Sequence, residues 1–447
     1  MAHLGIDIGT TKVSAVVVFR DAADPAIAAE DHHAALPRPD GFFEQDFERI
    51  AAAVRDVLAR LPRAALRDVS SIGISTQMHT ILLGRRDGAV SACVTWQDRR
   101  AEDLLPELRR ASGRPLHAGY GAVTLAWYAR RGELDGWEWA ATPGDELARR
   151  LVGADRVSMQ DATLAAAWGV YDPARRAWDD AALAALGIPG GLLPSIAPSG
   201  TCVGHTRGGF GGLPDGIPVF LPIGDNQASV LGSGGDPDTD LFVTVGTGSQ
   251  LSAILSAEAA ARLPVAPGLD LRPFPGGRVL AAVAPLSGGR GWSLFAEAVA
   301  GLFAAFGATP PDGNLLDRLS DLAEKAAPDA GGLRIVPDFF GSRLRPGSFG
   351  EITGITPSNF TLPNIAWALA LGIVDNLFAP MPASLLRARR RLIGSGNGLV
   401  KCAALRRAVQ TRCDLPLVLP RVREEAATGA ALFAASSAKS DHGIRTL

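Results

Sequence analysis

The chain has 447 residues, which is too long for one ordinary hydrophobic core, so two domains are expected. Hydrophobic residues make up 47% and charged residues 20%, a globular composition that excludes a largely disordered chain. The net charge of −2 gives no basic excess for nucleic acid, and no apolar run is long enough to span a bilayer. We therefore expect a soluble, cytoplasmic protein without nucleic-acid or membrane partners.

Residues 4–19 read LGIDIGTTKVSAVVVF, in which two apolar runs flank a glycine-threonine turn. This pattern predicts a β-hairpin at the start of the chain. The turn glycine lets a phosphate approach the backbone, and the hydroxyls of Thr10 and Thr11, beside Lys12, can donate to its oxygens. Asp7, near the end of the first strand, could hold a hydrated Mg²⁺. A hairpin without a ligand is the alternative.

Apolar residues at helical spacing predict a helix over residues 47–61, and VSSIGIS at residues 69–75 predicts a buried strand. This strand leads to Gln77, Met78 and His79 at its C-terminal end, where open α/β sheets present ligand-binding groups. Amide and imidazole groups can bind the hydroxyls of a polyol, and a methionine can contact its carbon skeleton. A purely structural His79 is the alternative.

Residues 92–100, ACVTWQDRR, place Trp96 and Asp98 after another short apolar strand. An aromatic ring with polar neighbours suits a sugar, although Trp96 could equally belong to the core. Residues 101–151 are predicted to be mostly helical. DATLAAAW at residues 161–168 and the YDPARRAW segment after it resemble a strand and a turn.

Residues 217–231, IPVFLPIGDNQASVL, predict a strand followed by a helix that begins near Gln227. Asp225 stands where this helix would have its N-cap, and Asn226 follows it. A capping role alone is the simpler interpretation of Asp225. Its position between two nucleotide-type hairpins favours a second interpretation, in which its carboxylate accepts a proton from a substrate hydroxyl that attacks a γ-phosphate.

The second of those hairpins is predicted at residues 241–255, LFVTVGTGSQLSAIL, and its turn contains Gly246, Thr247 and Gly248. It repeats the pattern of apolar strand, glycine-threonine turn and apolar strand seen at the start of the chain. Two like hairpins so far apart suggest two halves of related design. A nucleotide clamped between these halves is the natural hypothesis.

The motifs in the last part of the chain give weaker indications of function. LIGSGN at residues 392–397 predicts a strand that ends in glycines, where Gly396 and Asn397 could lie beside a flat base. Arg290 follows a glycine-rich turn, and the arginines between residues 387 and 391 resemble a solvated helix face. Small residues at 424–436 predict a helix that packs closely against a neighbour, within the chain or in a second copy.

DIGTT, QMH, WQD, GDNQAS, VGTGS and GSGN occur in this order over nearly the whole chain, and together they resemble the FGGY family of carbohydrate kinases. The resemblance implies an α/β, two-domain actin-like ATPase (ribonuclease H-like) fold, with mixed sheets flanked by helices and an interdomain cleft. Residues 1–232 would carry the sugar site and the catalytic aspartate, and residues 233–447 the nucleotide site.

The resemblance also implies roles for individual residues, and ATP and Mg²⁺ as the cofactors. Asp225 would be the general base, and Asp7 would bind Mg²⁺ with help from Asp225. Phosphate contacts would come from Thr10, Thr11, Lys12, Gly246, Thr247 and Gly248, and adenine contacts from Gly396 and Asn397. The sugar site would be lined by Gln77, Met78, His79, Trp96, Asp98 and Asn226.

VTWQDRR, GDNQAS and the C-terminal EEAATGAAL most resemble family members that convert sedoheptulose to sedoheptulose 7-phosphate, so a ketose is the expected substrate. Two departures put the sugar in doubt, because Thr80 follows QMH where the family has glycine and SGGRG at residues 287–291 replaces an LNGGN-like segment. Xylulose, ribulose or another polyol is the alternative. An actin-like ATPase switch without a sugar substrate is a different class, and a monomer and a homodimer are equally open.

Overall fold

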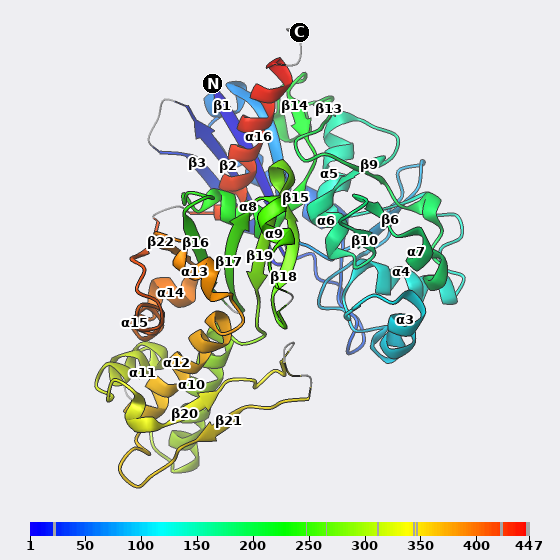
Figure 1. Cartoon of the computed structure of the whole chain (residues 1–447). Coiled ribbons are helices and arrows are strands. Elements are labelled where there is room, and N and C mark those ends of the chain that lie inside the picture. The colour runs from blue at the N-terminus through cyan, green and yellow to red at the C-terminus, as the bar shows by residue number, and fades with distance from the viewer. Residues whose placement is uncertain are drawn as a thin grey trace. The chain divides into compact units, whose positions relative to one another are not determined.

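The computed structural model forms two compact units, the first made of Met1–Ser233, Pro273–Arg278 and Val422–Leu447 and the second of Gly234–Arg272 and Val279–Arg421 (Figure 1). The structure describes residues 1–20, 24–246, 248–264, 266–310, 313–342, 345, 347–420 and 423–443. The C-terminal segment belongs to the first unit, whereas the sequence division at residue 232 places it in the second half. How function is divided between the halves stays a prediction.

A mixed seven-stranded sheet in the order β13-β14-β5-β1-β2-β3 forms the centre of the first unit, and β15 also pairs with β5. β1 pairs antiparallel with β2 and parallel with β5, which confirms the hairpin predicted over residues 4–19. The strands are β1 Ala2–Ile8, β2 Lys12–Phe19, β3 Ala26–Asp31, β5 Val69–Thr76, β13 Cys202–His205, β14 Pro218–Phe220 and β15 Ile223–Gly224. Short two-stranded sheets add β4 Glu44–Gln45, β7 Cys93–Val94, β6 Leu82–Gly84, β8 Trp139–Ala141, β9 Met159–Asp161, β12 Ser195–Ala197, β10 Tyr171–Asp172 and β11 Ala177–Trp178.

Helices complete the first unit around this sheet. The predicted helix at residues 47–61 is confirmed as α1, which begins after its N-cap Asp46 and buries one apolar face that includes Ile50, Val54 and Leu58. The helices are α1 Phe47–Arg60, α2 Arg63–Arg67, α3 Leu105–Ser112, α4 Gly121–Arg130, α5 Pro143–Val152, α6 Ala162–Ala167, α7 Asp180–Leu186, α8 Asp225–Gly232 and α16 Glu425–Gly443.

The C-terminal helix α16 packs directly on the sheet of the first unit, where Figure 1 shows it in red beside the blue strands β1 and β2. Glycines make this approach possible. A Cβ atom on Gly5 of β1 or on Gly73 of β5 would overlap a carbonyl oxygen of α16, and one on Gly429 would overlap the Ala228 carbonyl oxygen of α8. The small residues predicted to pack closely therefore pack within the chain.

The second unit has a six-stranded sheet in the order β18-β19-β17-β16-β22-β23. β16 pairs antiparallel with β17 and parallel with β22, and β17 pairs antiparallel with β19. The series β3-β2-β1-β5 of the first unit has the same directions as β19-β17-β16-β22, so the two related halves expected from the hairpins are present. The six strands are β16 Asp240–Val245, β17 Ser249–Leu255, β18 Asp270–Phe274, β19 Arg278–Val283, β22 Arg391–Ser395 and β23 Leu417–Val418. β20 Arg334–Val336 and β21 Glu351–Thr353 form a separate two-stranded sheet.

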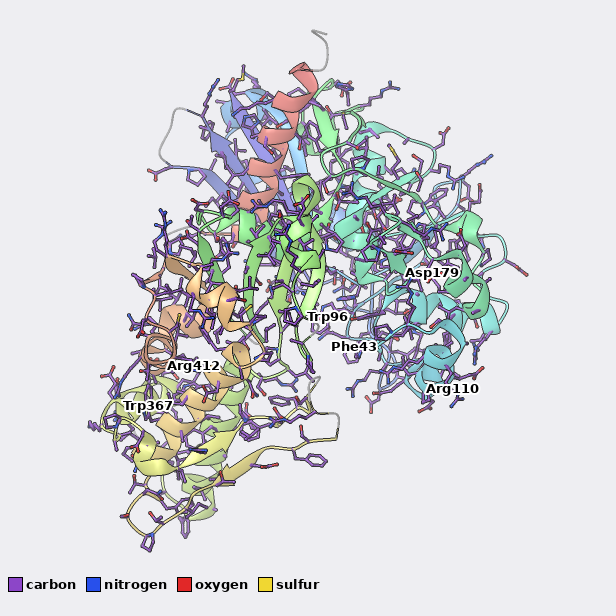
Figure 2. All side chains as sticks on the ribbon, in the orientation of Figure 1. Phe43, Trp96, Arg110, Asp179, Trp367 and Arg412 are labelled. Carbon is purple, nitrogen blue, oxygen red and sulfur yellow. The ribbon has the colours of Figure 1, made fainter. Side chains whose placement is uncertain are left out.

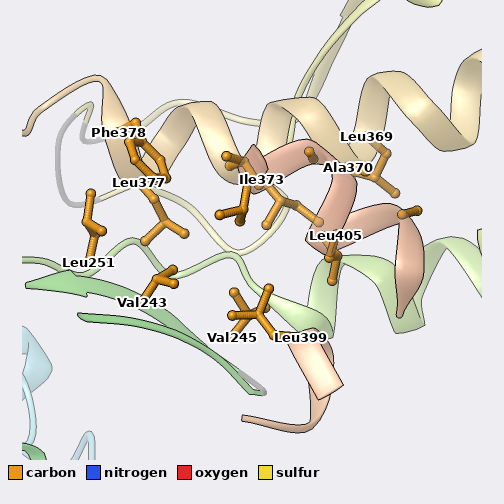
Figure 3. Close-up of a cluster of buried hydrophobic side chains, with 14 of the residues drawn as sticks. Val243, Val245, Leu251, Leu369, Ala370, Ile373, Leu377, Phe378, Leu399 and Leu405 are labelled. Carbon is orange, nitrogen blue, oxygen red and sulfur yellow. The ribbon is translucent and has the colours of Figure 1, made fainter. Parts of the chain in front are cut away.

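The core of the second unit lies between this sheet and α12 (Figure 3). Val243, Val245 and Leu251 of the hairpin strands face apolar side chains of α12 such as Ile373 and Leu377, and all five are buried. The helices are α9 Ala257–Ala261, α10 Gly289–Ala305, α11 Leu315–Glu324, α12 Leu362–Phe378, α13 Ala383–Arg387, α14 Asn397–Lys401 and α15 Ala403–Arg412. No helix in the described part of the chain is both long and apolar enough to cross a membrane.

Two local predictions are wrong. DATLAAAW forms the helix α6 rather than a strand, because Asp161 caps it by accepting a hydrogen bond from the Thr163 N–H and the alanines that follow favour a helix. The arginines after α13 do not form a solvated helix face. Arg389 is buried and donates to the carbonyl oxygens of Asp238 and Ile254, at 2.7 and 3.0 Å.

Candidate active site

Asp7 lies near the C-terminal end of β1, beside β5 at the centre of the sheet of the first unit. Its side chain is buried, and the Ser75 hydroxyl donates to its Oδ1 at 2.7 Å. Burial raises the pKa of Asp7 to about 7; the Ser75 hydrogen bond opposes this rise, and the negative charge of Asp225 adds to it. A cation bound beside this buried carboxylate would stabilise its ionised form.

The raised pKa of Asp7 has a consequence for the metal-free protein. Between about pH 4 and pH 7 the folded protein holds a proton on Asp7 that the unfolded chain has released, so stability falls as pH rises through this window. Asp7→Asn cannot ionise, so this part of the pH dependence should disappear. Above pH 7 in EDTA, we expect the variant to be more stable than the wild type.

Urea unfolding at pH 5, 6, 7 and 8 in EDTA measures this effect. Asp24→Asn, a change at an exposed aspartate of the same unit, is the matched control and should follow the wild type. Parallel pH profiles for the wild type and Asp7→Asn would contradict the expected burial of a titrating carboxylate.

The turn between β1 and β2 is held from two sides. The Trp96 indole N–H donates to the Thr10 hydroxyl oxygen at 2.9 Å, and Gln45 Nε2 donates to the Thr10 carbonyl oxygen at 2.6 Å. Thr11 is exposed, and Lys12 pairs with Glu424 at 2.7 Å. The turn is therefore fixed at Thr10, while the side chains of its next two residues reach solvent.

The side chains of Gln77 and Asp98 are both buried. Gln77 Nε2 donates to Gln45 Oε1 at 2.8 Å, which connects it to the Thr10 turn. Asp98 accepts two hydrogen bonds from the Arg100 guanidinium, at 2.8 and 2.9 Å, and one from the Phe43 N–H. The carboxylate of Asp98 is thus saturated by protein donors.

Trp96 is 47% exposed, in contrast to Gln77 and Asp98. Phe43 is also exposed, and its carbonyl oxygen accepts from the Thr95 N–H next to Trp96 at 2.9 Å. Figure 2 labels both rings on the first unit. An exposed indole whose N–H is already bonded offers its ring face, which is the surface that packs on the C–H groups of a sugar.

His79 follows β5 in a left-handed backbone conformation, with φ of +67°, which is uncommon for residues other than glycine. Its ring stacks on Tyr120 with centroids 4.6 Å apart, and Nδ1 lies 2.5 Å from the Ala167 carbonyl oxygen. Since a carbonyl oxygen only accepts, Nδ1 carries the proton. Met78 is buried against Leu164 and Ala167 of α6.

Asp225 is the first residue of α8, and Gly224 rather than Asp225 is the N-cap, so the predicted capping position is wrong by one residue. The reason is that Gly224 remains in β15 and pairs with Thr76 of β5. Asp225 Oδ1 accepts from the Asn226 N–H at 2.8 Å. The Asn226 side-chain oxygen is buried without a hydrogen-bond partner among the described residues.

β5 brings Asp7 and Asp225 to the same end of the sheet. Thr76 is the register partner both of Ile8, which follows Asp7, and of Gly224, which precedes Asp225. The electrostatic effect of Asp225 on Asp7 agrees with this placement. Carboxylate oxygens suit Mg²⁺, which keeps water or phosphate oxygens in its remaining positions. The described residues contain no cluster of three or more His, Cys, Asp or Glu side chains that could hold a metal alone.

In the second unit, glycines gather at the turn between β16 and β17. The Gly289 N–H, at the start of α10, donates to the Gly246 carbonyl oxygen at 2.8 Å, and a Cβ on Gly288 would overlap Gly248. Gly396 has φ of +84° and its missing Cβ would overlap the Val245 carbonyl oxygen. Gly246, Gly248, Gly396 and Asn397 therefore lie together, and Thr247 is outside the described residues.

Comparison with known proteins identifies the family of this chain. Residues 2–232 match the N-terminal domain of the FGGY family of carbohydrate kinases, and residues 296–438 match its C-terminal domain. The sedoheptulokinase of Homo sapiens is 31% identical over 466 residues, which covers 96% of each chain. This chain belongs to the FGGY family of carbohydrate kinases. It is thus a carbohydrate kinase that uses ATP.

Other FGGY kinases are similar as well. A glycerol kinase of Methylibium petroleiphilum is 30% identical over 490 residues, covering 96% of this chain and 89% of its own. The crystal structure of a xylulose kinase from Rhodospirillum rubrum aligns with a TM-score of 0.84 at 22% identity, over 98% of this chain and 90% of the other. The actin-like two-domain fold expected from the sequence is confirmed.

Several residues of the candidate site could not be found from sequence motifs. Gln45, Ser75, Arg100 and Thr163 support the predicted residues through hydrogen bonds, and each comes from a different part of the chain. Arg100 lies in the WQDRR stretch, but nothing local marks it as the partner of Asp98. The partners of Gln45, Ser75 and Thr163 are 32 to 68 residues away in the sequence.

Proposed function

We propose that this FGGY kinase phosphorylates a ketose, and that sedoheptulose is the leading substrate, with sedoheptulose 7-phosphate as the product. Two relatives named sedoheptulokinase, from Homo sapiens and Mus musculus, match over 96% of the chain at 31% and 30% identity. A glycerol kinase of similar identity leaves xylulose or another polyol as the alternative substrate.

The proposed mechanism rests on one observation, that Asp7 and Asp225 lie at the same end of the sheet, on either side of the end of β5. Asp225 takes the proton of a sugar hydroxyl as that oxygen attacks the γ-phosphorus of ATP, and the bond from this phosphorus to the bridging oxygen of ADP breaks. Asp7, with Asp225, would hold Mg²⁺, and the bound ion would supply positive charge for the phosphate oxygens. The electrostatic coupling of the two carboxyl groups supports this arrangement.

The turns of both units bind the nucleotide in this proposal. Thr10, Thr11 and Lys12 of the first unit contact phosphate oxygens. In the second unit, the phosphates contact Gly246, Thr247 and Gly248, and the adenine lies on Gly396 and Asn397. Support comes from the glycine turn packed on the start of α10, because backbone without Cβ atoms lets phosphates approach closely.

The side chains proposed to line the sugar site fall into two groups by their solvent exposure. Trp96 offers a ring face, and Asn226 has a buried amide oxygen without a partner among the described residues, which a sugar hydroxyl would satisfy. Met78 and His79 complete the proposed sugar site. Gln77 and Asp98 are buried and already bonded to protein, so we propose that they hold these residues in place and do not contact the sugar themselves.

An ATPase switch without a sugar substrate is the alternative of a different class. Asp225, Asn226 and His79 argue against it, because a switch needs neither a general base nor a histidine held in an uncommon conformation.

Sugar-dependent ADP release with Mg²⁺-ATP tests the proposal on sedoheptulose, D-xylulose, L- and D-ribulose and glycerol. Strong turnover on sedoheptulose alone is the expected result. Turnover only on another member of the panel would keep the mechanism and replace the substrate. Nucleotide binding without sugar-stimulated turnover would reject the kinase mechanism in favour of the switch.

A further inference from the structure

We propose that Thr163 is a positioning residue for the general base, and that α6 holds the base and the His79 loop at a fixed separation. This inference rests on the proposed role of Asp225. It concerns a helix that the sequence did not predict. This helix contacts Gly224, which precedes the base, and also Met78 and His79 of the proposed sugar site. Three contacts carry the argument.

The first contact is a hydrogen bond from α6 to the residue before the base. The Gly224 N–H donates to the Thr163 hydroxyl oxygen at 3.0 Å, and both residues are buried. Gly224 is the last residue of β15 and the N-cap of α8, so its position sets where Asp225 begins the helix. A side-chain hydroxyl from a separate helix therefore fixes the backbone next to the proposed base.

The second and third contacts come from the other end of α6. The Ala167 carbonyl oxygen accepts from His79 Nδ1 at 2.5 Å, and Ala167 packs with Leu164 against Met78. The same six-residue helix thus anchors His79, Met78 and the Gly224 backbone. Because close-packed interiors transmit displacements, a shift of α6 would move these groups together.

The position of α6 is itself fixed at its start. Asp161 is buried, accepts from the Thr163 N–H at 2.8 Å and ends β9, which pairs with β12. The helix is therefore tied to a strand through its cap. Thr163, two residues after that cap, has little freedom to follow a displaced Gly224.

Thr163→Val removes the hydroxyl at nearly constant volume and leaves the Gly224 N–H without its acceptor. Displacement of reacting groups by about 1 Å can cost on the order of 10²-fold in rate, so we expect kcat to fall by about 10- to 100-fold. KM for the sugar should change little, since the side chains that contact it remain. Thr163→Ser keeps the hydroxyl and should restore most of kcat.

Thr206→Val is the matched control. The Thr206 hydroxyl is equally buried, accepts from the Ile217 N–H at 2.9 Å and donates to the Pro214 carbonyl oxygen at 2.7 Å, in the turn between β13 and β14. This variant should lose similar stability to Thr163→Val in urea unfolding while keeping wild-type kcat. A purely structural role of Thr163 predicts equal kcat in the two valine variants.

Steady-state kinetics are measured for the four proteins and Asp225→Ala, on the panel sugar that gives the highest wild-type turnover. Loss of kcat in Thr163→Val, recovery in Thr163→Ser and no loss in Thr206→Val are the expected results. Wild-type kcat in Thr163→Val, with Asp225→Ala inactive, would overturn this inference alone. An active Asp225→Ala, or a wild type inactive on every sugar, would overturn the proposed function and this inference with it.

Discussion

Asp225→Ala is expected to reduce sugar-dependent ADP release by on the order of 10²- to 10⁴-fold, because the variant lacks the group that takes the proton of the attacking hydroxyl. Nucleotide binding should be largely retained, since the turns proposed to hold the phosphates and adenine are untouched. Asp225→Asn tests the same point with a side chain of equal size. Turnover numbers and the dissociation constant of ADP are the quantities to measure.

Asp215→Asn is the control for the loss of one negative charge from the same unit. Asp215 is exposed, and its Oδ1 accepts from the Gly209 N–H at 3.2 Å in a surface turn, so both turnover and ADP affinity should match the wild type. Retained turnover in Asp225→Ala would show that another group accepts the proton. Loss of ADP binding in that variant would place Asp225 chiefly in metal or nucleotide binding.

Gly429→Ala is expected to destabilise the first unit by about 3 kcal/mol or more, although alanine favours a helix over glycine. The added methyl group would overlap the Ala228 carbonyl oxygen of α8, and a backbone atom cannot rotate away as a side-chain atom can. Either α16 or α8 must shift, and both adjoin the sheet that carries Asp7. Urea unfolding followed by circular dichroism measures the change.

Gly301→Ala provides a matched comparison. Gly301 also lies within a helix, α10, but a Cβ atom there would meet open space. The substitution should stabilise the protein by up to about 1 kcal/mol through helix propensity alone. Equal effects of the two alanines would mean that the contact between α16 and α8 yields easily.

Strong periodicity made the main elements of this fold predictable from sequence. The two hairpins carry β-branched runs around glycine-threonine turns, and the spacing of apolar residues identifies α1. α6 was missed because its six residues give less than two helical turns, which is too short for a helical period to show. Its cap at Asp161 and its alanines are the local features that favour the helix.

The supporting residues of the site could not be predicted for a different reason. Gln45 reaches Thr10 and Gln77 across 35 and 32 residues of sequence, and Ser75 reaches Asp7 across 68. Such partners depend on sheet register, which no local pattern contains. The same is true of Arg389, whose buried bonds to Asp238 and Ile254 made a solvated face the wrong interpretation.

The late position of α16 in the chain bears on how the protein is made. A ribosome releases the strands of the first unit long before it synthesises the helix that packs on Gly5 and Gly73. Until then one face of that sheet lacks its cover, while residues 279–421 can already form their own core. Loss of the residues from 424 onward would therefore deprive the unit that holds Asp7 and Asp225 of its packing partner, although the lost residues are far from both aspartates in the sequence.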